Sequence, residues 1–383
     1  MTAAILTLAL ALSVQAAAAQ APSKPAAPKP RASFDSVAAQ AGAAREAGRL
    51  DDAIALYRRG LALRPIWDEG RWYLGSSLYE RDRYAEAHDA FAALIARRPT
   101  HAGAMGMQGL CEFSLGRHEA ALKTLLRARS LGVKRDPEIG RVVAYHAGIL
   151  LTRFEEFEIG YSVLQELVDA GVEGPTVIDA FGLNVLRMPM LPAVIPEARK
   201  PLVQLAGRAG YALASRRLAD AARLFDELVE AYPHEPNVHY ARGVLRTAEN
   251  PDGVLADFDA EIAISPDHVP ARLNAVFELL KRGDPARAQP YAEAAVRLAP
   301  QLFATHLAMG QVWFETGDVA KAATAFEQGV KLAPGSPQAH FLLARAYARL
   351  GRAADAERER AEFRRLEQLK TGQATGPGAA PPK

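Results

Sequence analysis

A spacing of 34 residues recurs along this chain of 383 residues and restricts its fold more than any other feature. The interval separates prolines, glycines and alanines in four series: Pro65 and Pro99; Pro266, Pro300 and Pro334; Gly283, Gly317 and Gly351; and Ala53, Ala87 and Ala121. A fixed period of this length is typical of a solenoid, in which one small supersecondary unit is stacked many times. A solenoid usually binds a partner along an extended surface.

Each unit has the pattern helix, tight turn, helix. A glycine or a polar pair ends the first helix, because glycine tolerates the left-handed backbone that closes a helix. A proline near the end of the unit stops the second helix. Within the second helix a small residue is followed four positions later by a large apolar one, as in Ala87 and Phe91, so both lie on one face. The pattern predicts an all-α, right-handed solenoid of about 8–9 helix-turn-helix repeats, interrupted near the middle.

These residues resemble the tetratricopeptide repeat. One unit carries the family's signature residues at Trp72, Leu74, Gly75, Ala87, Phe91 and Pro99, and another carries them at Gly310, Trp313, Ala322, Phe326 and Pro334. The resemblance extends from about residue 33 to residue 369, with a gap in the middle, and it suggests an exported bacterial protein of this type.

The ends of the chain differ in composition from the repeats. An apolar run over residues 3–14 followed by small residues up to Ala19 predicts a signal peptide over 1–19, although no Lys or Arg precedes the run. An uncleaved anchor is the competing interpretation. We expect an Ala/Pro-rich tether over 20–33 and a disordered tail over 370–383. The mature chain would have no membrane span and would be periplasmic or secreted.

The repeats divide into an N-terminal array, 34–170, and a C-terminal array, 202–369, that ends in a capping helix. Between them, 171–201 contains half a repeat and a proline-rich linker with Pro189, Pro192 and Pro196. Either this linker packs between the arrays, which we favour, or it is an exposed apolar binding loop. We expect the two arrays to unfold separately or to move relative to each other, and a protease to cut between Arg187 and Lys200.

Composition and motifs disfavour several functions. The net charge of +2 is too small for a nucleic-acid-binding face. The nine histidines form no His-Glu-x-x-His motif, and no phosphate-binding glycine loop or Gly-x-Ser-x-Gly sequence is present. Cys111, the single cysteine, lies on an apolar helix face and is expected to be buried. We therefore predict no enzyme activity, no cofactor and no metal site.

The family resemblance implies that the first helix of each unit lines a concave binding face. Mapped onto this sequence, the family's inward positions are Trp72, Ser76, Tyr79, Glu80, Leu110, Phe113, Tyr240, Leu273, Phe277, Leu307, Gln311, Phe314, Glu315, Phe341, Arg345 and Arg349. Their mixture of aromatic and charged groups suits an extended or helical peptide. The Lys and Asn set with which some relatives hold a peptide carboxyl terminus is absent, since Asn274 stands alone.

Two functions fit these sequence features. The first is a non-enzymatic scaffold in the cell envelope that binds a peptide or protein partner. The alternative is an accessory subunit that docks a separate envelope enzyme or machinery for polysaccharide assembly or export. The sequence identifies neither the partner nor the oligomeric state.

Overall fold

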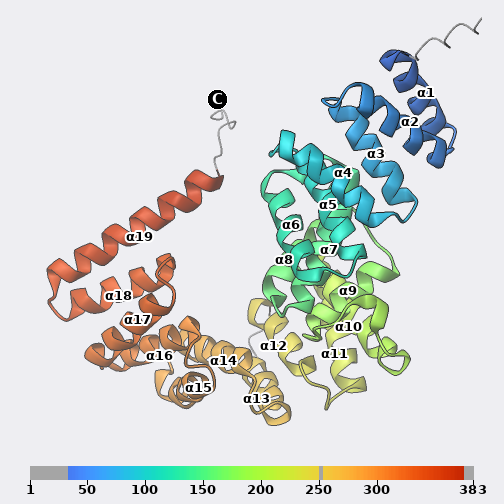
Figure 1. Cartoon of the computed structure of the whole chain (residues 1–383). Coiled ribbons are helices and arrows are strands. Elements are labelled where there is room, and N and C mark those ends of the chain that lie inside the picture. The colour runs from blue at the N-terminus through green and yellow to red at the C-terminus, as the bar shows by residue number, and fades with distance from the viewer. Residues whose placement is uncertain (1–32, 250–252, 375–383) are drawn as a thin grey trace, which may run out of the picture.

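The structure is a computed structural model that describes residues 33–249 and 253–374. Over these residues every regular element is an α-helix or a short 3-10 helix, and the helices stack into one curved array (Figure 1). The expected signal peptide, and the expected tether except for Ser33, lie outside the described residues. None of the described helices is both long and apolar enough to cross a bilayer.

Four antiparallel helix pairs precede the interruption. They are α1 (Phe34–Glu46) with α2 (Leu50–Leu63), α3 (Asp68–Glu80) with α4 (Tyr84–Arg97), α5 (Ala102–Ser114) with α6 (His118–Ser130), and α7 (Pro137–Arg153) with α8 (Phe157–Asp169). A 3-10 helix, η1 (Val133–Arg135), joins the third pair to the fourth.

Five pairs follow a single helix, α9 (Pro175–Val185), and two 3-10 turns, η2 (Pro192–Val194) and η3 (Glu197–Arg199). They are α10 (Lys200–Ala214) with α11 (Leu218–Ala231), α12 (Val238–Glu249) with α13 (Val254–Ile264), α14 (Val269–Lys281) with α15 (Pro285–Leu298), α16 (Phe303–Thr316) with α17 (Val319–Leu332), and α18 (Pro337–Arg349) with α19 (Ala353–Ala374). The prediction of an all-α solenoid of eight to nine repeats is confirmed.

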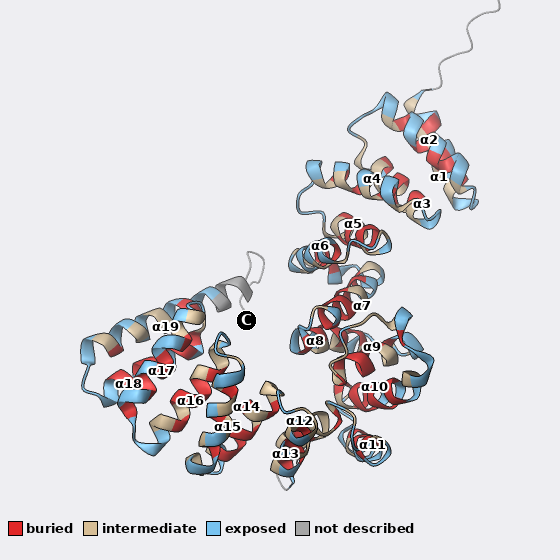
Figure 2. Ribbon diagram, turned by 60° about the horizontal axis from the view of Figure 1, so that its bottom comes forward, coloured by how far each residue is buried: buried red, intermediate tan, exposed pale blue. Residues whose placement is uncertain are grey.

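Small residues allow the two helices of a regular pair to approach closely. Ala87 and Ala322 are fully buried. A Cβ atom added to Gly75 would lie 2.7 Å from the ring of Phe91, and one added to Gly310 would lie 2.5 Å from the ring of Phe326. Figure 2 shows the result along the array, where buried residues face neighbouring helices and exposed residues cover the outside.

The interruption is closely packed. Helix α9 lies against α10, and a Cβ added to Gly182 would come within 2.0 Å of the Val203 carbonyl oxygen. The reverse contact is equally close, 2.0 Å between a Cβ on Gly207 and the oxygen of Ile178. The buried core runs through this junction without a break, from α5 to Tyr211 on α10. The sequence showed a missing second helix, but not that α9 would pack backbone to backbone against the next helix.

The proline-rich linker is anchored at several points. Ile195 is buried, and Met188 and Met190 pack on the core of the following pair, whereas Val194 is exposed. Arg187 adopts a left-handed backbone with φ of 50° and donates a hydrogen bond to Glu158 at 2.7 Å. The linker therefore packs its apolar groups instead of presenting them as a continuous exposed loop.

The last helix is longer than expected. Helix α19 continues to Ala374, so residues 370–374 are helical where the sequence predicted disorder. Once a helix has formed, each further residue adds a hydrogen bond at little cost, which outweighs the weak helix propensity of this segment. Ala356 and Leu366 of α19 are buried and Phe363 is half-buried, as a cap requires.

The α12–α13 pair contains charged groups in its interior. Asp257 on α13 is 2% exposed and receives hydrogen bonds from Arg242 and Arg246 of α12 at 2.6 and 2.9 Å. Glu261 is fully buried and accepts from the backbone N–H groups of Asn237 and Tyr240, at 2.8 and 3.2 Å. Glu261 of α13 thereby caps the start of α12. This role is usually filled by the side chain of the residue just before the helix.

Candidate functional site

All sixteen predicted binding residues lie on the first helix of a pair. Trp72, Ser76, Tyr79 and Glu80 are on α3; Leu110 and Phe113 on α5; Tyr240 on α12; Leu273 and Phe277 on α14; Leu307, Gln311, Phe314 and Glu315 on α16; Phe341, Arg345 and Arg349 on α18. The helices α12, α14, α16 and α18 contact one another in succession. The first helices of the last four pairs thus form one continuous face, which we call the inner face.

Three of the predicted residues are buried and do not reach a surface. Leu110, Leu273 and Leu307 are 3%, 9% and 3% exposed and pack in the core between helices. The family's inward positions were assigned by counting along the sequence. A shift of one position on a helix turns a side chain by about 100°, which is enough to move it from the surface to the core.

The predicted residues of α3 and α5 mainly contact their own neighbours. Trp72 packs on Phe91, with ring centroids 5.6 Å apart, and on His101 at 5.5 Å. Tyr79 packs edge-on against Tyr84 at 5.2 Å. Both rings therefore already pack against aromatic partners within the array.

The predicted residues of α16 and α18 come together. The guanidinium groups of Arg345 and Arg349 lie 4.9 and 5.0 Å from the centre of the Phe314 ring. Beside them is a cavity of about 110 Å³, whose lining includes Gln311 and Glu315. Phe314 and Arg345 of this cluster also line the cavity, whereas Arg349 does not.

Exposed apolar side chains extend this cluster along the inner face. Phe341 on α18 and Phe277 on α14 are 45% and 41% exposed. Val244 on α12, which the sequence did not single out, is 38% exposed. The apolar character of the inner face thus runs from α12 to α18.

A second cavity, of about 270 Å³, lies where the repeat is interrupted. Residues from α8 to α12 line it and are mostly apolar: Phe157, Glu158, Tyr161, Asn184, Val185, Arg187, Leu213, Phe225, Tyr240, Ala241 and Val244. Of these, only Tyr240 was predicted. The missing second helix of the α9 repeat is the sequence signal that could have drawn attention to this place, but the cavity itself is formed by residues of α8 to α12 that are far apart in the sequence.

The rim of this second cavity carries an ion pair. Arg187 pairs with Glu158, and its guanidinium lies 4.4 Å from the centre of the Phe157 ring and 5.7 Å from that of Tyr240. Desolvation at the rim raises the pKa of the Glu158 carboxyl, but the hydrogen bond and charge of Arg187 outweigh it and hold that pKa below its usual value. Burial also raises the pKa of Tyr161 well above its ordinary value. The tyrosine is therefore neutral and donates its hydroxyl hydrogen to the Gly210 carbonyl oxygen at 3.2 Å.

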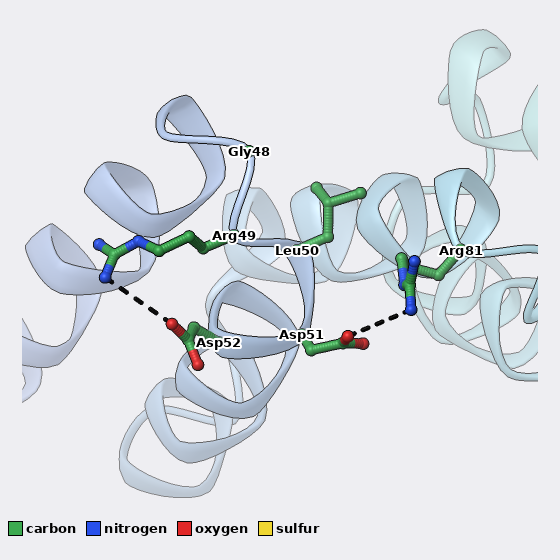
Figure 3. Close-up of a pocket in the computed structure, with 6 residues that line it drawn as sticks. All are labelled: Gly48, Arg49, Leu50, Asp51, Asp52 and Arg81. Carbon is green, nitrogen blue, oxygen red and sulfur yellow. Dashed lines mark ion pairs between the residues drawn. The ribbon is translucent and has the colours of Figure 1, made fainter.

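A surface groove near the N-terminus is polar and internally neutralised. It has a volume of about 290 Å³ and lies at the turn between α1 and α2, beside Arg81 (Figure 3). Arg81 pairs with Asp51 at 3.2 Å, and Arg49 pairs with Asp52 at 3.7 Å. Because Arg81 and Arg49 are each paired with an aspartate of the groove, we do not expect the groove to bind a charged ligand.

The groups most often used in catalysis have structural roles. Cys111 is fully buried, and burial raises the pKa of its thiol to about 12, which keeps it protonated and unreactive. His101 and His268 each accept a hydrogen bond from a backbone N–H at the start of a helix. His306 and His340 hydrogen-bond the carbonyl oxygen of the proline six residues earlier. Within residues 33–249 and 253–374, no three His, Cys, Asp or Glu side chains form a group that could hold a metal ion.

The fold defines a helical repeat protein in which the first helices of the last four pairs share one face. The tetratricopeptide repeat profile matches the chain over residues 38–90, 73–137, 207–268, 278–337 and 307–362. Because these matches cover more than half of the chain, the protein belongs to the tetratricopeptide repeat family.

Several solved structures are similar to parts of the chain. The MamA RS-1 ArsTM double mutant is 20% identical with a TM-score of 0.42, over 46% of this chain and 98% of that one. MamA from residue 41 to the end, from Desulfovibrio magneticus RS-1, is 20% identical with a TM-score of 0.41, over 46% and 99%. A further crystal structure of MamA is 16% identical with a TM-score of 0.40, over 43% and 96%. The search of curated proteins found no match.

Proposed function

We propose that the protein is a non-enzymatic interaction scaffold that binds a peptide or protein segment along the inner face of α12, α14, α16 and α18. The observation that carries this proposal is the apolar stripe of Val244, Phe277 and Phe341 on three of these four helices. Exposed apolar side chains that share one face of an array are a liability without a partner, and a segment laid along this face would cover them.

The two cavities support an extended ligand. The 270 Å³ cavity borders α12, and the 110 Å³ cavity lies between α14, α16 and α18. Neighbouring packed helices are about 8–10 Å apart, so the distance from α12 to α18 is on the order of 30 Å. An extended peptide covers this distance with about nine residues.

The test is a selection of displayed random dodecapeptides on the full-length chain. We expect the wild-type chain to enrich a defined set of peptides, and a variant carrying Phe277→Ser and Phe341→Ser to lose them. A matched control replaces two exposed leucines of second helices, Leu63→Ser and Leu298→Ser, and should enrich the same peptides. Absence of any enrichment, or equal enrichment by the stripe variant, would refute the proposal.

We also propose that the scaffold works in the cell envelope. This rests on the apolar run of residues 3–14 and the small residues up to Ala19, which suit export and cleavage. N-terminal sequencing of the protein purified from its native cell should give a mature chain that begins at Gln20. A chain that retains its first residues in the cytoplasmic fraction would contradict this.

A further inference from the structure

Two arginines of the inner face have no acidic partner among the described residues. Arg345 and Arg349 lie one turn apart on α18, and no carboxylate oxygen of residues 33–249 or 253–374 is within ion-pair distance of either. Arg352, only a few residues further on, pairs with Asp355 at 2.6 Å. Arg345 and Arg349 are thus two neighbouring exposed guanidinium groups on one helix face that have no carboxylate partner among the described residues.

Both guanidinium groups are held in place by other contacts. Each lies over the Phe314 ring, and Arg349 donates a hydrogen bond from Nη1 to the Phe314 carbonyl oxygen at 3.1 Å. Arg345 also lies 5.9 Å from the centre of the Phe341 ring. A guanidinium carries five N–H donors in a fixed plane, so these contacts orient it while leaving most of its donors unused.

The adjoining cavity contains an unsatisfied acceptor. The side-chain oxygen Oε1 of Gln311 is buried and has no hydrogen-bond donor among the described residues. The cavity beside it is lined by apolar groups of Leu280, Phe326 and Leu342. A buried acceptor without a donor is unfavourable, and a ligand N–H would relieve it.

The chain's own terminal segments do not provide the missing acidic side chain. Residues 1–32 and 375–383 contain neither Asp nor Glu. Glu315 lines the same cavity, but it is not within ion-pair distance of Arg345 or Arg349. An acidic group of a bound peptide would give both guanidinium groups a charged partner.

We infer that this end of the inner face binds an extended peptide in which an acidic residue stands next to an aliphatic or aromatic one. The carboxylate binds Arg345 and Arg349, whose planar donors match its two oxygens. The neighbouring apolar side chain enters the cavity, and Gln311 accepts a backbone N–H of the peptide. This inference rests on the proposed function and specifies the chemistry of its ligand.

The experiment uses the same displayed dodecapeptide library on the full-length chain and on a variant carrying Arg345→Glu and Arg349→Glu. We expect the wild-type chain to enrich Asp or Glu beside Leu, Ile, Phe or Tyr. The double variant should lose these peptides. For the most enriched peptide, replacing its acidic residue by the matching amide should weaken binding by fluorescence anisotropy about tenfold to a hundredfold, the usual range for a hydrogen bond to a charged group.

A matched control variant changes the net charge by the same amount as Arg345→Glu with Arg349→Glu. Arg59→Glu on α2 and Arg208→Glu on α10 alter two exposed arginines outside the inner face and should leave the enriched peptides unchanged. Far-UV circular dichroism of both double variants checks that the helices are intact.

Three outcomes decide the matter. Acidic peptides that bind the wild-type and control chains but not the Arg345 and Arg349 variant support the inference. Enriched peptides without acidic residues, or peptides that bind this variant equally well, overturn the inference and leave the proposed function standing. No enrichment on any chain overturns the proposed function, and the inference with it.

Discussion

The α9–α10 junction and the α12–α13 pair both depart from the regular repeat, but in opposite ways. At α9–α10 the helices meet through Gly182 and Gly207 with their backbones nearly in contact, and the surrounding core is apolar. At α12–α13 the core is small and two carboxylates, Asp257 and Glu261, are buried in it. The irregular, proline-rich linker thus lies beside a close apolar contact between α9 and α10. The α12–α13 pair keeps the repeat pattern, but its packing depends on buried ion pairs and hydrogen bonds.

The difference shows that an irregular stretch of sequence can coincide with close packing between neighbouring helix pairs. Nearest-neighbour contacts carry the stability of a solenoid, so the quality of each contact matters more than the regularity of the connecting loop. An apolar contact is insensitive to pH and salt, while a core that holds carboxylates depends on keeping their partners in place. We therefore expect the stability of the array to depend most strongly on pH and salt near α12–α14.

The largest effect is expected at the close contact of α9 and α10. Gly182→Ala or Gly207→Ala places a Cβ against a backbone oxygen that cannot easily move, so each should destabilise the protein by about 2–3 kcal/mol. Gly42→Ala on α1 is the matched control, because no atom lies within 4 Å of its added Cβ. It should be neutral or stabilising by up to about 1 kcal/mol.

Urea denaturation followed by circular dichroism measures these changes. If Gly182→Ala and Gly42→Ala shift the midpoint in the same direction, the two helices do not approach as closely as described. The α9–α10 junction would then no longer differ from the α12–α13 pair in how closely its helices pack.

The buried carboxylate of Glu261 provides the second test. Glu261→Ala leaves the backbone N–H groups of Asn237 and Tyr240 without their acceptor, and should cost about 2 kcal/mol. Glu230→Ala on α11 removes an exposed carboxylate and should change the stability by less than about 0.5 kcal/mol. Equal denaturation midpoints for the two variants would show that the carboxylate does not support α12.

Limited trypsin digestion compares the linker with an ordinary connection. Arg187 and Arg199 pair with Glu158 and Glu235, each at 2.7 Å, so cleavage after them should be slow. Lys134 and Arg135 in η1 are exposed and should be cut earlier. Early fragments that end at Arg187 or Arg199 would contradict this expectation and support the hinge that the sequence analysis predicted.

The smallest expected effect is a pH dependence near α12–α14. Burial lowers the pKa of His268, whose ring accepts from the Ala271 N–H and donates to the Asn237 side chain at 2.9 Å. The unfolded chain, with an ordinary histidine pKa of about 6.5, therefore takes up the proton first. This contribution to stability is present above about pH 6.5 and is lost as the pH falls from there toward the folded pKa.

A His268→Asn variant isolates this contribution, since Asn can still accept a hydrogen bond at the helix start. Burial also lowers the pKa of His146 on α7, so the wild-type profile alone would mix two histidines. Urea midpoints between pH 7.5 and 5 should fall less steeply for the variant than for the wild type. Identical slopes would mean that His268 does not couple pH to stability.

The sequence by itself determined the helices, their turns and their pairing. Within a pair the contacts are local, so a glycine such as Gly317 and a proline such as Pro334 mark the ends of helices without knowledge of the rest of the chain. The same locality explains why the fully buried Ala87 and Ala322 could be identified from spacing alone. The α16–α18 part of the candidate site was also predictable, because its residues recur at the repeat interval.

Only the tertiary structure decided which surfaces remain accessible. Leu110, Leu273 and Leu307 sit at inward positions of the sequence pattern and yet pack in the core between helices, a burial that counting along the sequence does not reveal. The contact of Gly182 with α10 and the cavity at the interruption depend on the approach of separate units. Such contacts between units have no fixed spacing in the sequence, and they decide where this array is closely packed and where it can bind.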